Sequence, residues 1–362
     1  MTEFSYSNVN DDTPVLVGSS QLTDKRGVDG FNYLDILKEV SRKALSDCEA
    51  STDINEHIDT VAVIRFVADT PHRDSATSNL WGYPNMPRSL SNSLGLSASN
   101  EIYTTTGGNS PQIALNELTK RIKDKQIECA LLAGGEALDT FVGRLKEGLS
   151  VDWEDNPGGS PEVIGKSTDG TNDHEKLHGI FDPSSVYPLF ANSIRGKKGQ
   201  SVEEHMQDTG ELFSRFSEVA SKNENAWFPI HRSAEEIAEV KPENRMIGLP
   251  YTKYMNSIMR VNQSSAIVVM SAKKARELGI PESKWIFMYS GACLNDVWNV
   301  SNRADYYSSP AIKSCTDSVF DLANVSISEM DFIDLYSCFP SAVQIAMEEL
   351  SLDKNDPRGF TV

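Results

Sequence analysis

The sequence predicts an α/β protein in which a parallel sheet is covered by helices. Short apolar runs end in glycine or polar turns, as buried strands do. Between them lie stretches whose apolar residues recur at helical spacing, and the same alternation returns in the last third of the chain. The chain has 362 residues, of which 39% are hydrophobic, so it can bury a sizeable core without disulfide bonds.

The first 145 residues carry the clearest alternation. A helix is predicted over residues 33–48, and a second helix begins at about Pro111, because apolar residues recur there at helical spacing. Strands are predicted over residues 14–18, 60–66, 101–105 and 129–133.

Residues 146–258 have a different composition. Residues 152–173 are rich in Gly, Pro, Ser, Asp and Asn and are predicted to be a loop. Ser201 and Glu204 form a capping box at the start of a long amphipathic helix, and a shorter helix begins in the same way at Ser233. We interpret this block as a mostly helical insertion between two α/β halves, with an ordinary second domain as the alternative.

The last third of the chain returns to the α/β pattern. Residues 112–118 (QIALNEL) and 344–350 (QIAMEEL) are alike, although any amphipathic helix can produce such a heptapeptide. The repeated pattern around them supports a duplicated architecture. Strands are predicted over residues 266–270, 285–289 and 332–336, and helices over 272–278 and 341–350.

Composition excludes several classes of function. With 52 acidic and 34 basic residues the net charge is −18, which repels polyanions and argues against nucleic-acid binding. There is no apolar run of about 18 residues that would span a membrane. The five cysteines are an odd number without paired short spacing, so we expect a reducing, cytoplasmic location and no metal site.

Two turns between a predicted strand and a predicted helix are candidate binding sites. The first contains Gly107, Gly108, Asn109 and Ser110 and ends at Pro111, which suits a first helical turn. Unpaired N–H groups at a helix N-terminus favour an anionic or carbonyl ligand, and ligands of α/β sheets bind at this end of the strands. An empty structural turn explains the same residues equally well.

The second turn contains Tyr336, Ser337, Cys338 and Phe339. A helix N-terminus can lower the pKa of a thiol and activate it, but a small residue packed under the helix is the interpretation that we favour, because no histidine lies nearby in the sequence.

The densest basic cluster lies just before the helix that opens at Ser201. It consists of Arg195, Lys197 and Lys198, which form either a phosphate site or a solvated turn.

These turns and the segments around them resemble the thiolases, and most closely the bacterial thiolase-like proteins related to the sterol-carrier-protein thiolases. The resemblance extends nearly from end to end. It is carried by TPVLVGSSQLTDKRG (13–27), GGNSPQIALNEL (107–118), ALLAGGEAL (130–138), YPLFANSIRGKKGQSVEEH (187–205), NRMIGLPYTKYMNSIMRVNQSSAIVVMS (244–271) and DFIDLYSCFPSAVQIAMEEL (331–350).

The resemblance implies two similar βαβαβαββ halves packed face to face. By this resemblance, residues 1–145 are the N-terminal half, 146–258 an inserted loop domain and 259–362 an incomplete C-terminal half. Thiolases form or cleave a carbon–carbon bond next to an acyl-CoA thioester, using a nucleophilic Cys, an activating His, a second Cys and an Asn-Glu-Ala-Phe segment. The resemblance therefore implies an acetyl-CoA acetyltransferase-like protein of lipid metabolism, with a CoA thioester as substrate or ligand and no other cofactor.

Carrying the thiolase motifs over to this sequence fails at the nucleophile. Its position falls on Gly107, and the serine of the same motif falls on Asn109. The Asn-Glu-Ala-Phe segment falls on Tyr336, Ser337, Cys338 and Phe339, of which only the Phe agrees. We therefore expect a thioester-binding protein in which Asn109 and Cys338 are the catalytic candidates. The expected substrate-binding residues are Gly107, Gly108, Ser110, Tyr336, Ser337, Phe339, Arg195, Lys197 and Lys198.

The family's C-terminal segments, with the activating histidine and the second cysteine, have no counterpart in the sequence. The expectation is that the chain is a fragment of a longer product; a naturally short second half is the alternative. Two further functional alternatives are an active acyltransferase that uses another nucleophile, such as Cys338, and a non-catalytic subunit. The expected partners are an acyl-CoA-type molecule and either a second copy of the chain or another chain that completes the second half.

Overall fold

The structure, a computed structural model, describes residues 6–70, 81–166, 168 and 170–362. The chain divides into two compact units. Unit 1 comprises Met1–Ser167 and Met259–Tyr289, and unit 2 comprises Thr168–Ile258 and Ser290–Val362. No helix in the described part of the chain is both long and apolar enough to cross a lipid bilayer.

Unit 1 is built on a mixed sheet of seven described strands, in the order β5-β3-β2-β4-β8-β1-β9. Strands β2, β3, β4 and β5 are parallel, and β8 is antiparallel to both β4 and β1. The strands are β1 (Pro14–Thr23), β2 (Thr60–Val63), β3 (Asn100–Thr104), β4 (Cys129–Ala137), β5 (Glu162–Ile164), β8 (Asn262–Ser271) and β9 (Ile286–Phe287).

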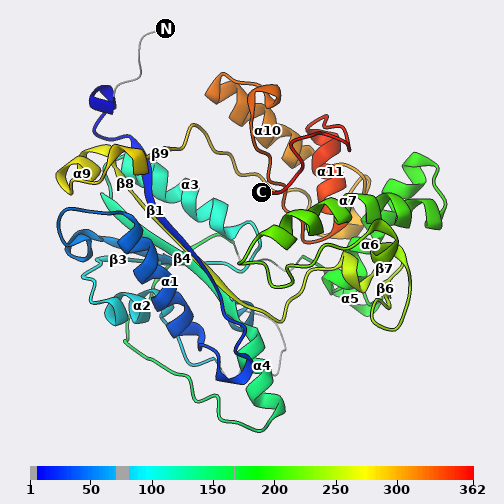
Figure 1. Cartoon of the computed structure of the whole chain (residues 1–362), viewed down its shortest axis with the longest axis horizontal. Helices are drawn as coiled ribbons and strands as arrows, with labels where there is room; N and C mark the ends of the chain where they lie inside the picture. The colour runs from blue at the N-terminus through cyan, green and yellow to red at the C-terminus, as the bar shows by residue number, and fades with distance from the viewer. Residues whose placement is uncertain (1–5, 71–80, 167, 169) are drawn as a thin grey trace. The chain divides into compact units, whose positions relative to one another are not determined.

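Helices pack on both faces of this sheet, which confirms the predicted α/β class (Figure 1). Helix α1 (Tyr33–Asp47) buries its apolar stripe on one face, and α3 (Ser110–Lys123) covers the other face with Ala114, Leu118 and Ile122. The central strand β2 is buried along its whole length, because both faces are covered. The remaining α-helices of unit 1 are α2 (Met86–Leu94), α4 (Leu138–Lys146) and α9 (Ala272–Glu277).

Two strands of the sheet differ from the prediction. Strand β8, which the sequence places in a C-terminal half, pairs with β4 and β1 in the sheet of unit 1. Strand β5 lies within the segment predicted as loop, where three residues pair with β3 at the edge of the sheet. Neither pairing has a local sequence signal, because both depend on residues far away along the chain. Residues 167 and 169 of that predicted loop lie outside the described residues.

Unit 2 is mainly helical in its described residues. The capping boxes at Ser201 and Ser233 are both present, so the two predicted helix starts are confirmed. The helices are α5 (Asp173–Leu177), α6 (Pro183–Lys198), α7 (Val202–Lys222), α8 (Ala234–Ala238), α10 (Pro310–Ala323) and α11 (Pro340–Glu349), and a small hairpin joins β6 (Met246–Gly248) to β7 (Tyr251–Thr252).

The strand predicted over residues 332–336 is wrong as a paired strand. The segment is extended, and Ile333 and Leu335 are buried while their neighbours are exposed. Its one backbone bond to a distant described residue runs from Leu335 N–H to Phe360 O, at 2.9 Å. Residues 290–362, all of them described, contain no strand with which it could pair.

Candidate functional site

The first candidate site is the loop of residues 105–109, which we call the strand-end loop. It leaves the carboxyl end of β3 and enters α3 at Ser110. Ser110 is buried, and its hydroxyl donates to Thr105 O at 2.7 Å, while its N–H donates to Gly107 O at 3.1 Å. Thr105 N–H donates in turn to Ile164 O of β5 at 2.9 Å. These bonds hold the loop at the carboxyl edge of the parallel strands.

The strand-end loop presents backbone donors that no described residue uses. The N–H groups of Gly107, Gly108 and Asn109 have no acceptor among residues 6–70, 81–166, 168 and 170–362. Asn109 is the N-cap of α3, yet its side chain makes no capping bond. Gly108 and Asn109 are exposed, so their donors are open to a ligand. Such a group of N–H donors at a helix start suits an oxyanion or a polarised carbonyl.

Gly107 has room for a side chain. A Cβ atom there would lie 3.0 Å from Asn109 Oδ1 and 3.1 Å from Ser110 Oγ. Both contacts are tight but involve side-chain atoms, which can shift by a few tenths of an ångström. The glycine is therefore not required by crowding of the backbone at this position.

A charged pair supports the loop from the end of β2. Arg65 donates from Nη1 to Asp69 at 2.6 Å and from Nε to Thr104 O at 3.0 Å, and its guanidinium lies 3.9 Å above the ring of Tyr103. Burial raises the pKa of Asp69 despite the arginine. Thr70, just beyond this pair, donates from its hydroxyl to that of Thr106 at 3.1 Å.

Glu136 lies at the carboxyl end of β4, beside the same edge. Its Oε1 accepts the N–H of Val67 at 2.7 Å, and its Oε2 is buried with no partner among the described residues. Burial raises the pKa of this carboxyl from 4.5 to about 7, and the Val67 N–H offsets only part of that effect. Sequence reasoning missed Glu136, although it follows two glycines at the end of a buried strand.

Cys338 lies in unit 2, immediately before α11. Its thiol donates to Tyr187 Oη at 3.3 Å, and Ser257 donates to its carbonyl oxygen. Burial raises the pKa of the thiol, so the start of α11 does not produce an activated thiolate here. The adjacent Phe339 is buried and stacks on the ring of Tyr187 at 4.1 Å. Tyr336 is exposed and Ser337 is partly buried.

The predicted basic cluster is engaged with neighbours inside unit 2. Arg195 donates to Gln200 O at 2.9 Å, which closes the end of α6. Lys197 pairs with Glu348 at 3.0 Å, and Lys198 lies 3.5 Å from Asp208. Each of the three cations therefore already has an acceptor.

A larger site in unit 2, which we call the basic–apolar pocket, has a volume of about 560 Å³. Phe213, Phe216 and Ile230 are among its apolar lining residues, and none of the lining residues is acidic. Its cations are Arg232, whose guanidinium lies 4.0 Å above the ring of Tyr254, and the exposed Lys253. Within the described residues neither cation has an ion-pair partner. Aromatic residues followed by isolated cations are the sequence signal that would have predicted it.

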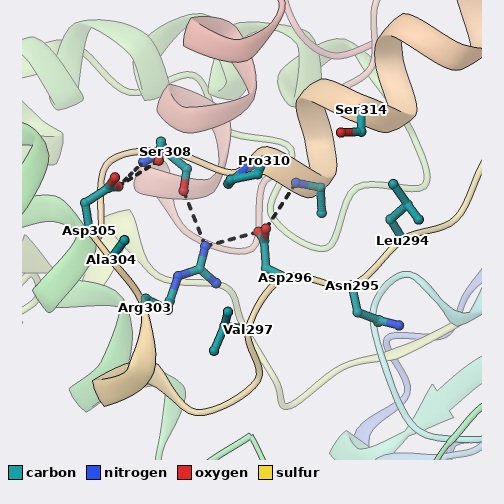
Figure 2. A pocket seen from close by; sticks show the side chains of 11 residues that line it. Leu294, Asn295, Asp296, Val297, Arg303, Ala304, Asp305, Ser308, Pro310 and Ser314 are labelled. Atoms are coloured by element: carbon teal, nitrogen blue, oxygen red, sulfur yellow. Dashed lines mark hydrogen bonds and ion pairs between the residues drawn. The ribbon is translucent and has the colours of Figure 1, made fainter.

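A second pocket in unit 2, of about 380 Å³, lies at the start of α10 (Figure 2). Figure 2 shows Arg303 directed toward Asp296, to which it donates at 3.0 Å, and toward Ser308 O. Asp296 also accepts from Ser309 Oγ and from Ala311 N–H. Arg303 and Asp296 of this pocket therefore pair with each other, which distinguishes it from the basic–apolar pocket.

The predicted site residues thus fall into two groups, each within its own unit. The structure brings together Gly107, Gly108, Asn109 and Ser110 in unit 1. In unit 2 it brings Cys338 and Phe339 against Tyr187, whereas the basic cluster of Arg195, Lys197 and Lys198 makes contacts of its own. Ser337 also lines the basic–apolar pocket.

Comparison with known proteins links this geometry to one group. No protein-family model matches the chain. A solved structure of a monomeric SCP2-thiolase-like protein from Mycobacterium smegmatis is 30% identical, with a TM-score of 0.79 over 98% of this chain and 66% of that one. Human mitochondrial 3-ketoacyl-CoA thiolase in complex with CoA is 15% identical, with a TM-score of 0.58, 96% coverage of this chain and 86% of that one.

One curated relative was also found. An acetyl-CoA acetyltransferase of Methanocaldococcus jannaschii is 24% identical over 252 residues, which are 67% of this chain and 60% of the relative. The chain thus spans just under two thirds of the length of the Mycobacterium smegmatis structure and three fifths of this relative.

Proposed function

The chain belongs to the thiolase superfamily, and from this premise we propose that it binds an acyl-CoA or a similar thioester without forming an acyl-enzyme at residue 107. The chain resembles an acetyl-CoA acetyltransferase only distantly, so the type of reaction that it catalyses is also something that we propose. The observation that carries the proposal is Gly107. The resemblance places the nucleophilic cysteine of the thiolases at this residue, and a glycine there has no sulfur that could be acylated.

The strand-end loop would act on the thioester carbonyl. The N–H groups of Gly107, Gly108 and Asn109, which have no acceptor among the described residues, would donate to a carbonyl oxygen and would bind it more strongly as negative charge develops on it. Ser110 would contribute indirectly, because its hydroxyl bond to Thr105 O fixes the path of the loop. The loop would therefore polarise the thioester and stabilise an enolate or an oxyanion.

Within unit 2, the basic–apolar pocket is a candidate site of its own for a nucleotide such as that of CoA. Arg232 and Lys253 are cations without acidic partners among the described residues, and phosphates are the natural ligands of such groups. The aromatic side chains beside them offer surface for an adenine ring. Arg195, Lys197 and Lys198 are weaker candidates, because a phosphate would have to displace acceptors that they already have.

Titration calorimetry with CoA tests this function. We expect binding by the unaltered chain and a loss of affinity of about tenfold for each of Arg232→Ala and Lys253→Ala. Lys313→Ala on α10 is the matched control, since this exposed lysine pairs with Asp317 away from the pocket and should leave the affinity unchanged. Absence of heat and of a thermal shift with both CoA and acetyl-CoA would refute the proposed function.

The alternative of an active acyltransferase assigns the nucleophile to Cys338. It requires an acetyl adduct on Cys338 after incubation with acetyl-CoA, and loss of that adduct in Cys338→Ala. The raised pKa of the thiol and its bond to Tyr187 favour a packing role, so we expect peptide mass spectrometry to find no adduct at this residue.

The partners remain proposals as well. The similar Mycobacterium smegmatis protein is monomeric, while a homodimer or a completing partner chain is the prediction from the sequence. Light scattering on the purified chain, at micromolar concentration and with CoA present, distinguishes a monomer from a dimer. A cooperative melt of the monomer would speak against a requirement for a second chain.

A further inference from the structure

Glu136 faces the helix that begins at the strand-end loop. Strand β4 pairs with β8 without a register break from Cys129 to Ala137, so its side chains alternate regularly. Ala130 and Leu132 pack in the cluster under α3, while Ala133 and Ala137 pack in the cluster under α1. Glu136 lies an even number of residues from Ala130 and Leu132 along the strand. Its side chain therefore points to the same face of the sheet, the face that α3 covers.

Glu136 also lies level with the strand-end loop. Val63 of β2 is paired with Ala133 of β4 on one side and with Tyr103 of β3 on the other. Glu136 follows Ala133 by three residues within β4, and Thr106 follows Tyr103 by three residues, in the loop just after β3. The segment after β2 ties the two together, because Val67 donates to Glu136 and Thr70 donates to Thr106.

The carboxyl group of Glu136 has one oxygen that can accept a proton. One oxygen is held by Val67 N–H, and the other is buried and accepts no bond from a described residue. Arg65 and Asp69 on the neighbouring segment pair with each other, and no cation in the described part of the chain forms an ion pair with Glu136. Burial, and after it the negative charge of Glu136, raises the pKa of Tyr33 on α1. A carboxylate in this setting is a stronger base than an exposed one.

We propose that Glu136 is the general base that removes a proton from the carbon next to the thioester carbonyl of a ligand bound at the strand-end loop. The inference rests on the proposed function. In the step, the C–H bond breaks and an O–H bond forms on Glu136 Oε2. The electron pair of the C–H bond moves into the enolate, whose oxygen is stabilised by the free N–H groups of residues 107–109. In the reverse direction Glu136 returns the proton, so no other reactant is consumed.

The structure favours Glu136 over the other acid at this edge. Asp69 already accepts from Arg65 at 2.6 Å, and a paired carboxylate is a poor base. Glu136 combines a free oxygen with a pKa of about 7, which matches a base that works near neutral pH.

Deuterium exchange into the methyl group of acetyl-CoA, followed by NMR in D₂O, measures this step directly. We expect exchange above the buffer rate with the unaltered chain, a rate that rises with pH and levels off above about pH 7, and a loss of at least about 100-fold in Glu136→Gln. Glu128→Gln, just before the other end of β4, is the matched control and should exchange normally, because Glu128 pairs with Lys274 away from the loop.

The outcomes separate this inference from the proposed function. Acetyl-CoA that binds in calorimetry but does not exchange refutes the role of Glu136 and leaves the binding proposal standing. If deuterium exchange persists in Glu136→Gln, a residue other than Glu136 is the base. If acetyl-CoA does not bind at all, the proposed function itself fails. CoA affinity that is unchanged in Glu136→Gln, together with lost exchange, supports the inference and excludes general damage to the fold.

Discussion

At the scale of single residues, Gly107 has no side chain at the position that the resemblance to thiolases assigns to the nucleophile. Gly107 adopts no conformation reserved for glycine, and the nearest atoms to a Cβ there belong to the movable side chains of Asn109 and Ser110. The backbone at the start of α3 is therefore compatible with cysteine.

This compatibility predicts the behaviour of Gly107→Cys. The variant should fold, and its thiol should have a lowered pKa because it lies at the N-terminal end of α3. We expect faster alkylation by iodoacetamide at this residue than at the exposed Cys293, together with an acetyl adduct after incubation with acetyl-CoA, both measured by peptide mass spectrometry. Gly196→Cys, with open space around its Cβ near the end of α6, is the control and should remain unacylated. A Gly107→Cys thiol that alkylates no faster than Cys293 would contradict this account of the loop.

Glu136 predicts a pH dependence of stability. Its pKa is raised from 4.5 to about 7 in the folded chain, so folding favours the protonated form. The stabilisation is fully present below about pH 4.5 and is lost as the pH rises through 7. We expect the Glu136→Gln variant to gain roughly 1–3 kcal/mol of unfolding free energy relative to the unaltered chain between about pH 5 and pH 8, measured by urea titration. An identical difference at both pH values would show that the carboxyl does not titrate in this range.

Three features of the candidate site show how much of it can be predicted from the sequence. The order of strand, turn and helix around Gly107 was predicted correctly, because these elements are neighbours in the sequence, while the role of Gly107 remains a prediction. Glu136 lay in a quoted segment but was not chosen, since its burial depends on β2 and on the segment after it. The basic cluster was chosen for its charge, but its pairing with Glu348 and Asp208 involves other helices and has no local signal.

At the scale of elements, helix starts were the most predictable features. The capping box that opens α7 lies within four residues: Ser201 Oγ accepts the N–H of Glu204 at 3.1 Å, and Glu204 accepts the N–H of Ser201 at 2.7 Å. The extended segment of residues 332–336 shows the opposite case. The segment is extended, as a strand is, but a strand also needs a partner, and none lies in residues 290–362.

The capping box predicts a measurable contribution to stability. Ser201→Ala removes the acceptor for the Glu204 N–H and should lower the unfolding free energy by roughly 1 kcal/mol in a urea titration. Ser221→Ala near the end of the same helix is the control, because its hydroxyl bonds only to Glu218 O within the helix, and a change within about 0.5 kcal/mol is expected. Equal losses in both variants would mean that helix propensity, rather than the cap, accounts for the effect.

At the scale of the whole molecule, two features matter: the net charge of the chain and the path that the chain takes between its two units. The net charge of −18 repels an anionic ligand at long range, so the proposed binding of CoA would depend on local cations such as Arg232 and Lys253. The chain leaves unit 1 after Ser167 and returns at Met259 to add β8 between β4 and β1. Composition predicted an inserted helical block, but nothing local shows that the returning strand completes the first sheet.

This division predicts where CoA protects the backbone from hydrogen exchange. The basic–apolar pocket is lined entirely by residues of unit 2, so CoA should slow exchange in peptides covering residues 213–232 and 253–258. Free CoA carries no acyl carbonyl for the N–H groups of the strand-end loop, so peptides covering residues 105–110 should gain protection only with acetyl-CoA. Mass spectrometry of the two complexes at equal saturation makes the comparison, with Arg232→Ala as the variant that removes protection from the first set. Protection of the strand-end loop by CoA alone, without any change in the pocket peptides, would assign the nucleotide to unit 1 and overturn the roles proposed for Arg232 and Lys253.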